Sequence, residues 1–146
     1  MILTKACEYG IRAVVFLAQP THLQRKSSQQ EIADAIGSPA PFTGKILQQL
    51  QKKGVVCSSK GKQGGFFLDQ NRLEQLNVRD IVDALEGTGT YDRCIMGLSA
   101  CTDKQPCPLH RHFQPLKKNI QQLFEKTKIS DMTPGIENGK QFLQLP

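Results

Sequence analysis

Three of the chain's five cysteines and one of its three histidines lie in the stretch CIMGLSACTDKQPCPLH, which runs from Cys94 to His110. Six residues separate Cys94 from Cys101, and five separate Cys101 from Cys107. Thiols and an imidazole grouped in this way can form a disulfide, bind a metal or act as redox-active thiols. The rest of the sequence helps to choose among these chemistries.

The expected compartment of the protein narrows the choice. No apolar run approaches the ~20 residues that cross a bilayer, and the start MILTKACEYG lacks the layout of a secretory signal. We therefore expect a cytoplasmic protein with no membrane partner. Because stable disulfides are rare in the reducing cytoplasm, clustered cysteines there more often bind metal or act as redox thiols.

An iron-sulfur cluster is the metal group that best suits these ligands. Cluster iron prefers soft thiolates and needs four terminal ligands, so three cysteines leave one position for His110. Cys107 precedes Pro108, a favourable first helical residue, and a helix N-terminus stabilises a thiolate. We expect [2Fe-2S] rather than [4Fe-4S]. Zinc is an alternative, although its ligand pairs are usually closer in sequence, and purely thiol-based redox chemistry is another.

The hydrophobic pattern before the cysteines predicts four helices and one β-hairpin. Apolar residues recur at helical spacing, with Thr4, Ser28 and Asn77 as N-caps. The predicted helices cover residues 4–18, 28–37, 41–54 and 77–87, and the hairpin covers residues 55–69. Helix, tight turn, helix and hairpin follow one another as in a winged helix-turn-helix. The predicted fold class is therefore mainly α with a small β-hairpin wing.

Charge indicates a second candidate site, a surface for nucleic acid. The chain carries 19 Lys and Arg against 13 Asp and Glu, a net charge of +6. No acidic residue occurs between Asp34 and Asp69. Five lysines lie in that window: Lys45, Lys52, Lys53, Lys60 and Lys62. A surface that only needs solubility normally mixes both signs, whereas one that meets phosphates gains by excluding carboxylates.

The second helix of the helix-turn-helix is expected to enter the major groove of double-stranded DNA. The hairpin is expected to reach phosphates or the minor groove. Two residues of the helix, Pro41 and Gly44, are rigid or small and would permit close approach. The predicted DNA-binding residues are Ser28, Gln29, Pro41, Thr43, Gly44, Lys45, Gln48, Gln49, Lys60, Lys62, Gln63 and Gly64.

A last helix is predicted to follow the cysteines and to reach about Lys126. Its apolar residues form one continuous seam: Phe113, Leu116, Ile120, Leu123 and Phe124. We favour a homodimer seam over internal packing, because the winged unit already closes on itself. Pro115 predicts a kink or a helix restart. The expected division is a winged domain at 1–87, a cysteine loop at 88–108, a dimerisation helix at 109–126 and a tail at 127–146.

Several stretches resemble the Rrf2 family of bacterial winged-helix transcriptional regulators. They are LTKACEYGIRAVVFLA, EIADAIG, KILQQLQKKGVV, SSKGKQGGFFL and DIVDALEG, and the resemblance extends from residue 1 to about residue 126. The most specific pieces are the K-x-G-x-x-G-G wing turn and the later E-G. The resemblance implies a homodimer whose long C-terminal helix crosses its partner, with the cysteine loop between that helix and the preceding one.

Some members of this family hold an iron-sulfur cluster through three cysteines of this loop, and others lack the cysteines. The gap between Cys94 and Cys101 is one residue longer than in the pattern it resembles. In one group of members a histidine three positions after the last cysteine is present, as His110 is here. In another group a carboxylate from the first helix of the other subunit is the fourth ligand, and Glu8 occupies the matching position.

We expect a dimeric transcriptional regulator that acts as a repressor and senses redox state, nitric oxide or iron-sulfur supply. One alternative is a small iron-sulfur redox carrier that docks on an acidic protein. Another is a zinc-stabilised DNA-binding regulator without a sensing role. No nucleophile paired with a base, no P-loop and no dinucleotide-binding pattern occurs, so neither an enzyme nor a small-molecule substrate is expected.

Overall fold

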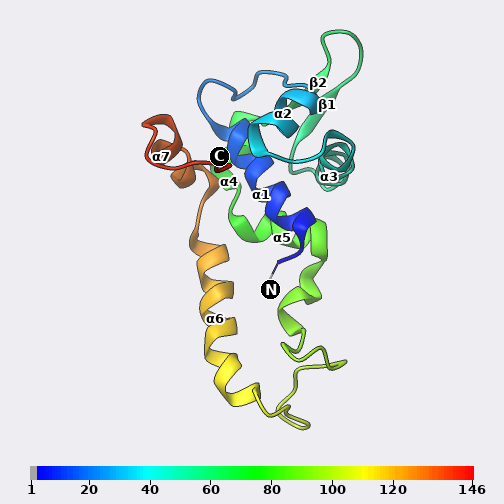
Figure 1. Cartoon of the computed structure of the whole chain (residues 1–146), viewed down its shortest axis with the longest axis vertical. Helices are drawn as coiled ribbons and strands as arrows, with labels where there is room; N and C mark the ends of the chain where they lie inside the picture. Colours follow the sequence, from blue (N-terminus) through cyan, green and yellow to red (C-terminus); the bar gives the residue numbers. More distant parts are fainter. Residues whose placement is uncertain (1–2) are drawn as a thin grey trace.

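The computed structural model describes residues 3–146 and shows a helical body from which a hairpin and one long helix project (Figure 1). Its two strands are β1 (Cys57–Ser59) and β2 (Gly65–Phe67). The helices are α1 (Lys5–Ala18), α2 (Gln29–Ile36), α3 (Ala40–Lys52), α4 (Gln70–Gln75), α5 (Val78–Glu86), α6 (His110–Lys126) and α7 (Pro134–Glu137). Two 3-10 turns, η1 (Thr88–Asp92) and η2 (Ile129–Met132), flank the cysteine loop and α6. Within the described residues no helix is both long and apolar enough to cross a membrane.

The core is built around α1. Every residue from Ala13 to Ala18 is buried, and Val14 and Leu17 are completely inaccessible to solvent. Helices α2, α3 and α5 and the turn η2 all pack against this helix. Apart from Tyr91, at the start of the cysteine loop, the buried core contains no residue of that loop or of α6.

The helix ends follow the signals in the sequence. Thr4 accepts a hydrogen bond from the Cys7 amide at the start of α1, and Ser28 does the same from the Glu31 amide at the start of α2. At the end of α2, Gly37 adopts a left-handed conformation with φ of 67°. These caps satisfy backbone groups that a helix end leaves without partners. The predicted winged helix-turn-helix fold is confirmed.

The hairpin is antiparallel, and it gains a third segment that the sequence did not reveal. Cys57 pairs with Phe67, and Ser59 pairs with Gly65. Ser27, which directly precedes the N-cap residue of α2, forms an isolated bridge with Phe66. Backbone hydrogen bonds of 2.8 Å in both directions join these two residues. The base of the wing is thus fixed to the start of the helix-turn-helix.

Three elements differ from the sequence-based expectation. Helix α4 was not predicted, because six residues are too few to show a hydrophobic period. Helix α3 begins at Ala40, so Pro41 is the second helical residue. Helix α6 begins at His110 and continues through Pro115, and no restart occurs there. Its proline lacks an amide hydrogen, so the carbonyl of Arg111 receives no intrahelical donor.

The chain after α6 returns to the winged body. The Val78 amide donates to the Thr127 carbonyl at 3.0 Å, and the Ile129 amide donates to the Leu76 carbonyl at 3.1 Å. Ile129 is fully buried in the core. The end of α6 is therefore attached to the start of α5.

Asn77 should contribute measurably to stability, because it and Asp80 form a reciprocal capping box at the start of α5. We expect Asn77→Ala to lower the free energy of unfolding by about 1 kcal/mol, measured by urea denaturation. Asn71→Ala, in the exposed part of α4, is the control and should change stability little. Equal stability of Asn77→Ala and the wild type would contradict this role.

Candidate nucleic-acid interface and cysteine site

One face of α3 is open to solvent. Pro41, Lys45, Gln48 and Lys52 are exposed, and their spacing of four, three and four residues places them on one side of the helix. Lys52 was not among the predicted contact residues, although its spacing from Lys45 could have identified it. The face presents two cations and one amide, the side-chain types that meet phosphates and base edges.

Other predicted contact residues do not lie on this face. The outward orientation predicted for Thr43 is wrong, since its side chain is fully buried and its hydroxyl lies 3.0 Å from the Pro39 carbonyl and 2.9 Å from the Ser38 hydroxyl. Gly44 is also buried, because the Gln29 side chain lies directly against it. Gln29 in turn donates to the Ala40 carbonyl at 2.6 Å. These residues hold α2 and α3 together.

Gln49 has a similar internal role. Its amide donates to the carbonyls of Ala84 and Leu85 at 3.2 Å each, at the end of α5. Ser28 uses its hydroxyl to cap α2. Both residues therefore orient the helices, and the sequence signal for this is clear only for Ser28, whose spacing from Glu31 is typical of an N-cap.

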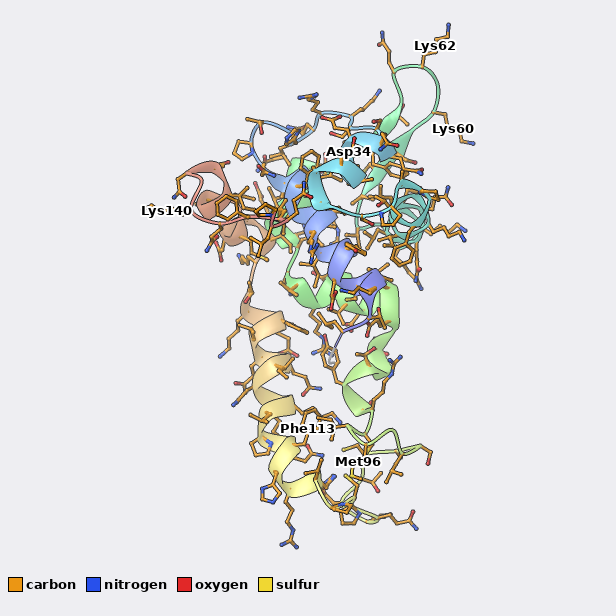
Figure 2. All side chains as sticks on the ribbon, in the orientation of Figure 1. Asp34, Lys60, Lys62, Met96, Phe113 and Lys140 are labelled. Carbon is orange, nitrogen blue, oxygen red and sulfur yellow. The ribbon has the colours of Figure 1, made fainter. Side chains whose placement is uncertain are left out.

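The tip of the wing carries the second group of predicted residues. Lys60, Lys62 and Gln63 are exposed, and the two lysines point away from the body (Figure 2). Gly64 lies behind them in a tight turn, where a Cβ atom would meet the carbonyl oxygens of Ser59 and Gly61. A glycine is thus needed there for the chain to turn back.

The cysteine loop brings its ligand residues together in pairs. The Cys101 sulfur lies 3.4 Å from Nδ1 of His110, and Nε2 of His110 lies 2.8 Å from a carboxylate oxygen of Asp103. Gln114 donates to the Cys101 sulfur at 3.6 Å. The Cys107 thiol lies near Cys94 and contributes to lowering the pKa of the Cys94 thiol. Among residues 3–146, no three His, Cys, Asp or Glu side chains are arranged as a metal site.

Cys94 is the most enclosed of the three cysteines. Its pKa is lowered by a hydrogen bond from the Leu98 backbone, with further hydrogen bonds from the Met96 backbone and the Cys107 thiol. Hydrogen bonds of this kind favour the thiolate, the form that binds metal. Glu8 lies outside this cluster, on α1, where it pairs with Lys5 at 2.8 Å.

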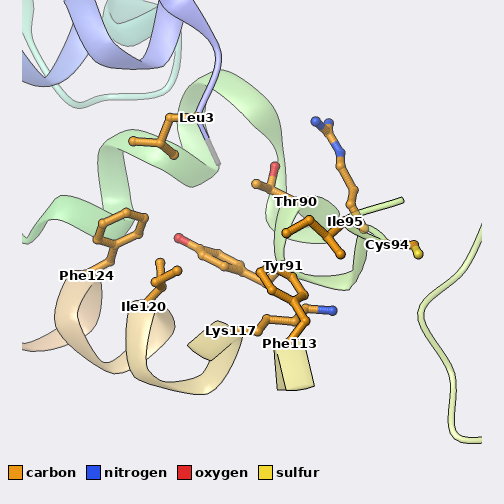
Figure 3. A pocket seen from close by; sticks show the side chains of 10 residues that line it. Leu3, Thr90, Tyr91, Cys94, Ile95, Phe113, Lys117, Ile120 and Phe124 are labelled. Carbon is orange, nitrogen blue, oxygen red and sulfur yellow. The ribbon is translucent and has the colours of Figure 1, made fainter. Parts of the chain in front are cut away.

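A cavity of about 210 Å³ separates the start of the loop from α6 (Figure 3). It is lined by side chains of both segments and by Leu3, which precedes α1. The Tyr91 hydroxyl points into the space between Leu3, Ile120 and Phe124. That hydroxyl is buried without a hydrogen-bond partner among the described residues, and burial raises the pKa of Tyr91 to about 12. Cys94 lies on the rim of the same cavity.

The outer side of α6 is apolar and uncovered. Leu116 and Leu123 are 56% and 59% exposed. With Phe113, Asn119 and Ile120 they line a shallow groove along the helix. Large aliphatic side chains in a row are unusual on the surface of a monomer.

Comparison with known proteins identifies this architecture. Residues 3–135 match the Rrf2 family, described as iron-dependent transcriptional regulators. A protein of Aquifex aeolicus, named as an HTH-type transcriptional regulator, is 31% identical over 134 residues, which cover 90% of this chain and 91% of that protein. Among solved structures, IscR of T. potens matches with a TM-score of 0.72 and 24% identity, over 95% of this chain and 90% of that one.

A second solved structure shows the same fold. CymR of B. subtilis, described as a global cysteine regulator, matches with a TM-score of 0.67 and 19% identity over 89% of this chain and 94% of that chain. The family consists of transcriptional regulators and not of enzymes, so the function shown is transcriptional control through DNA. The winged helix-turn-helix, its lysine-tipped hairpin and the match over nearly the whole chain lead to one conclusion: this chain belongs to the Rrf2 family of DNA-binding transcriptional regulators.

Proposed function

We propose that this regulator binds DNA as a homodimer, with α3 in the major groove and the wing on the backbone, and that the cysteine loop holds a sensing cluster. The observation that carries the DNA contact is the exposed face of α3. Lys45, Gln48 and Lys52 are on that face, and no carboxylate occurs anywhere between Asp34 and Asp69. A surface without carboxylates avoids repulsion from phosphates.

Within this contact, the two parts of the surface have different tasks. Gln48 and Lys45 are suited to reach base edges, because both are exposed on the same side of α3, the second helix of the helix-turn-helix. Lys60 and Lys62 extend farther, at the end of the hairpin, and are suited to phosphates on either side of the groove.

Replacing both wing lysines with alanine should weaken binding to every DNA sequence. Each phosphate contact contributes about 0.9 to the slope of log K against log salt, so Lys60→Ala with Lys62→Ala should flatten that slope by up to about two units. The slope is measured by fluorescence anisotropy on a duplex of arbitrary sequence at several salt concentrations.

The matched control is Lys128→Ala with Lys140→Ala, which removes the same charge from exposed positions in the C-terminal segment. This control should keep the wild-type slope. An unchanged slope in the wing variant would show that the wing does not touch phosphate.

Dimerisation is supported by the uncovered apolar side of α6. Phe113 and Ile120 line both the outer groove and the inner cavity, so the apolar surface continues from one to the other. A second copy of the same helix would cover both at once. A symmetric pair of winged units could place two recognition helices about one DNA turn, roughly 34 Å, apart.

Leu116→Asp together with Ile120→Asp should yield monomers, because two carboxylates per subunit would have to be buried in an apolar contact. Analytical ultracentrifugation measures the oligomeric state. Lys118→Asp with Gln122→Asp, exposed positions on other sides of α6, should leave the dimer intact. A double seam variant that sediments as a dimer would assign the seam to internal packing.

The residues of the loop fit an iron-sulfur cluster in donor chemistry. Cys94, Cys101 and Cys107 supply three soft ligands, and His110 is already beside Cys101. The arrangement is in two pairs, so binding one cluster requires the loop to bring Cys94 and Cys107 toward Cys101. Most residues between 95 and 106 are exposed, which leaves the loop free to make this movement.

A bound cluster would supply a group that changes with oxidant, nitric oxide or iron supply. The protein residues around it have separate tasks. The Asp103 carboxylate contacts Nε2 of His110, so the other ring nitrogen, Nδ1, faces the Cys101 sulfur. Glu8 is the alternative fourth ligand, contributed by the other subunit of the proposed dimer. Zinc at the same ligands, without sensing, is the competing function.

Anaerobically purified protein should contain iron and acid-labile sulfide, and replacing any one of the three cysteines with serine should remove both while the fold is kept. The fold should survive because, apart from Tyr91, the buried core contains no residue of the loop. Circular dichroism checks the fold, and chemical assay measures iron and sulfide. Zinc without sulfide would support the competing function.

The fourth ligand is tested with His110→Ala and Glu8→Ala. We expect His110→Ala to hold a labile cluster with an altered visible spectrum, and Glu8→Ala to match the wild type. An unaltered spectrum in His110→Ala, with cluster loss in Glu8→Ala, would assign the fourth position to the carboxylate. Cys57→Ser is the control for a cysteine outside the loop.

A further inference from the structure

The last residues of the chain end on the helix-turn-helix. After α7 the chain runs back over the winged body, and the C-terminus lies there and not beside the far end of α6 (Figure 1). Gln144 donates its side-chain amide to the Asp34 carbonyl of α2 at 2.7 Å. Leu143, the residue before it, packs against the hydrophobic core. A segment that is 110 residues away in sequence thus contacts the first helix of the DNA-binding unit.

The contact supplies a donor to the C-terminal end of α2. A helix leaves its last four carbonyls without intrahelical donors. At the end of α2, the Ala33 carbonyl accepts from the backbone amides of Gly37 and Ser38. The Ile36 carbonyl accepts from the Arg12 guanidinium at 3.2 Å. The Asp34 carbonyl is another of these four, and its donor is Gln144 alone among the described residues.

Gly37 makes room for this contact. The Gln144 amide oxygen lies 2.6 Å from the position that a Cβ atom of residue 37 would occupy. Gly37 also has φ of 67°, a conformation that favours glycine. The residue that turns the chain between α2 and α3 is therefore also the one against which the Gln144 side chain packs. After Gly37, only Ser38 and Pro39 precede the start of α3.

We infer that Gln144 is a positioning residue for DNA recognition, which holds the turn between α2 and α3 and thereby the orientation of α3. Because the recognition helix starts directly after this turn, a change in the turn alters which side chains reach the base edges. The inference rests on the proposal that α3 is the recognition helix. The C-terminal residues thereby orient α3, a role that neither the wing nor the cysteine loop has.

The effect of losing Gln144 should appear in sequence-specific binding. Water can replace a lost donor at an exposed carbonyl, so one hydrogen bond changes an equilibrium by roughly two- to tenfold. We expect Gln144→Met, which keeps the length but lacks the donor, to weaken specific binding three- to tenfold. Gln144→Glu should act at least as strongly, because its carboxylate repels the Asp34 carbonyl. Binding to non-specific DNA depends on phosphate contacts and should stay unchanged.

Gln144→Lys is the rescue variant. A lysine restores a donor of sufficient reach, and it should bind specific DNA within about twofold of the wild type. Gln141→Met makes the same chemical change three residues earlier, at a side chain with no hydrogen bond among the described residues, and serves as the control. Specific duplexes are obtained by selection from a random library with the full-length wild-type protein, and a scrambled duplex measures non-specific binding.

Amide hydrogen exchange gives the second readout. In Gln144→Met the amides of Gly37 and Ser38 should exchange faster than in the wild type, while those of the α1 core should not. Wild-type affinity in Gln144→Met, or equal weakness of Gln144→Met and Gln144→Lys, would overturn the inference. So would equal losses of specific and non-specific binding with faster exchange throughout α1, since that pattern indicates general destabilisation.

The proposal about α3 is tested separately. Lys45→Ala and Gln48→Ala should reduce the preference for selected over scrambled DNA if α3 reads the bases. Their failure to do so, with the expected effects of the Gln144 variants, would overturn α3 as the reading element and would leave Gln144 positioning a different DNA-contacting element. Effects of Lys45→Ala and Gln48→Ala without any effect of Gln144→Met would remove the positioning role and leave α3 as the reader.

Discussion

Burial of α1 is the constraint on which the rest of the molecule depends. A helix that is apolar on most sides must be surrounded, and α1 is surrounded by α2, α3, α5 and η2. Val14 and Leu17, which are completely buried, therefore fix the relative positions of the helix-turn-helix and of the last part of the chain. The proposed DNA contact depends on the same packing, because α3 can present an exposed face only when its other face is held on this core.

The same constraint explains why α6 and the cysteine loop differ from the body. Of these two segments only Tyr91 belongs to the buried core, and α6 contacts the body through residues such as Phe124 while Leu116 and Leu123 stay uncovered. The loop is anchored at its start by the buried Tyr91 and at its end by the buried His110. Between these anchors it can change shape without unfolding the winged unit.

Local signals in the sequence predicted most of the fold and part of the site. The caps at Thr4, Ser28 and Asn77 depend on residues only three positions away, and the structure has them as predicted. Thr43 was misplaced, because the period of α3 alone does not show which of its sides is covered by neighbouring helices, and Thr43 is fully buried.

Contacts across long sequence distances were the other part that the sequence could not reveal. Gln49 looks like a free amide on an exposed position, yet it bonds α5, 35 residues away. The polar tail gave no period at all, because its order comes from single anchors such as Ile129 and Gln144 and not from a repeated apolar face. Sequence patterns report faces of helices well, and they report single side-chain partners poorly.

A chain of direct contacts joins the cysteine loop to the DNA-binding unit. His110 is both the partner of Cys101 and the first residue of α6, so a rearrangement of the loop acts on the start of that helix. The other end of α6 is bonded to the start of α5 through Thr127 and Val78, and the end of α5 is bonded to α3 through Gln49. Contact alone does not make a switch, because a switch needs an element with two stable arrangements. In this chain the loop is the segment best suited to have two, since it is held at both ends, is exposed between them, and carries the proposed ligand residues in separate pairs.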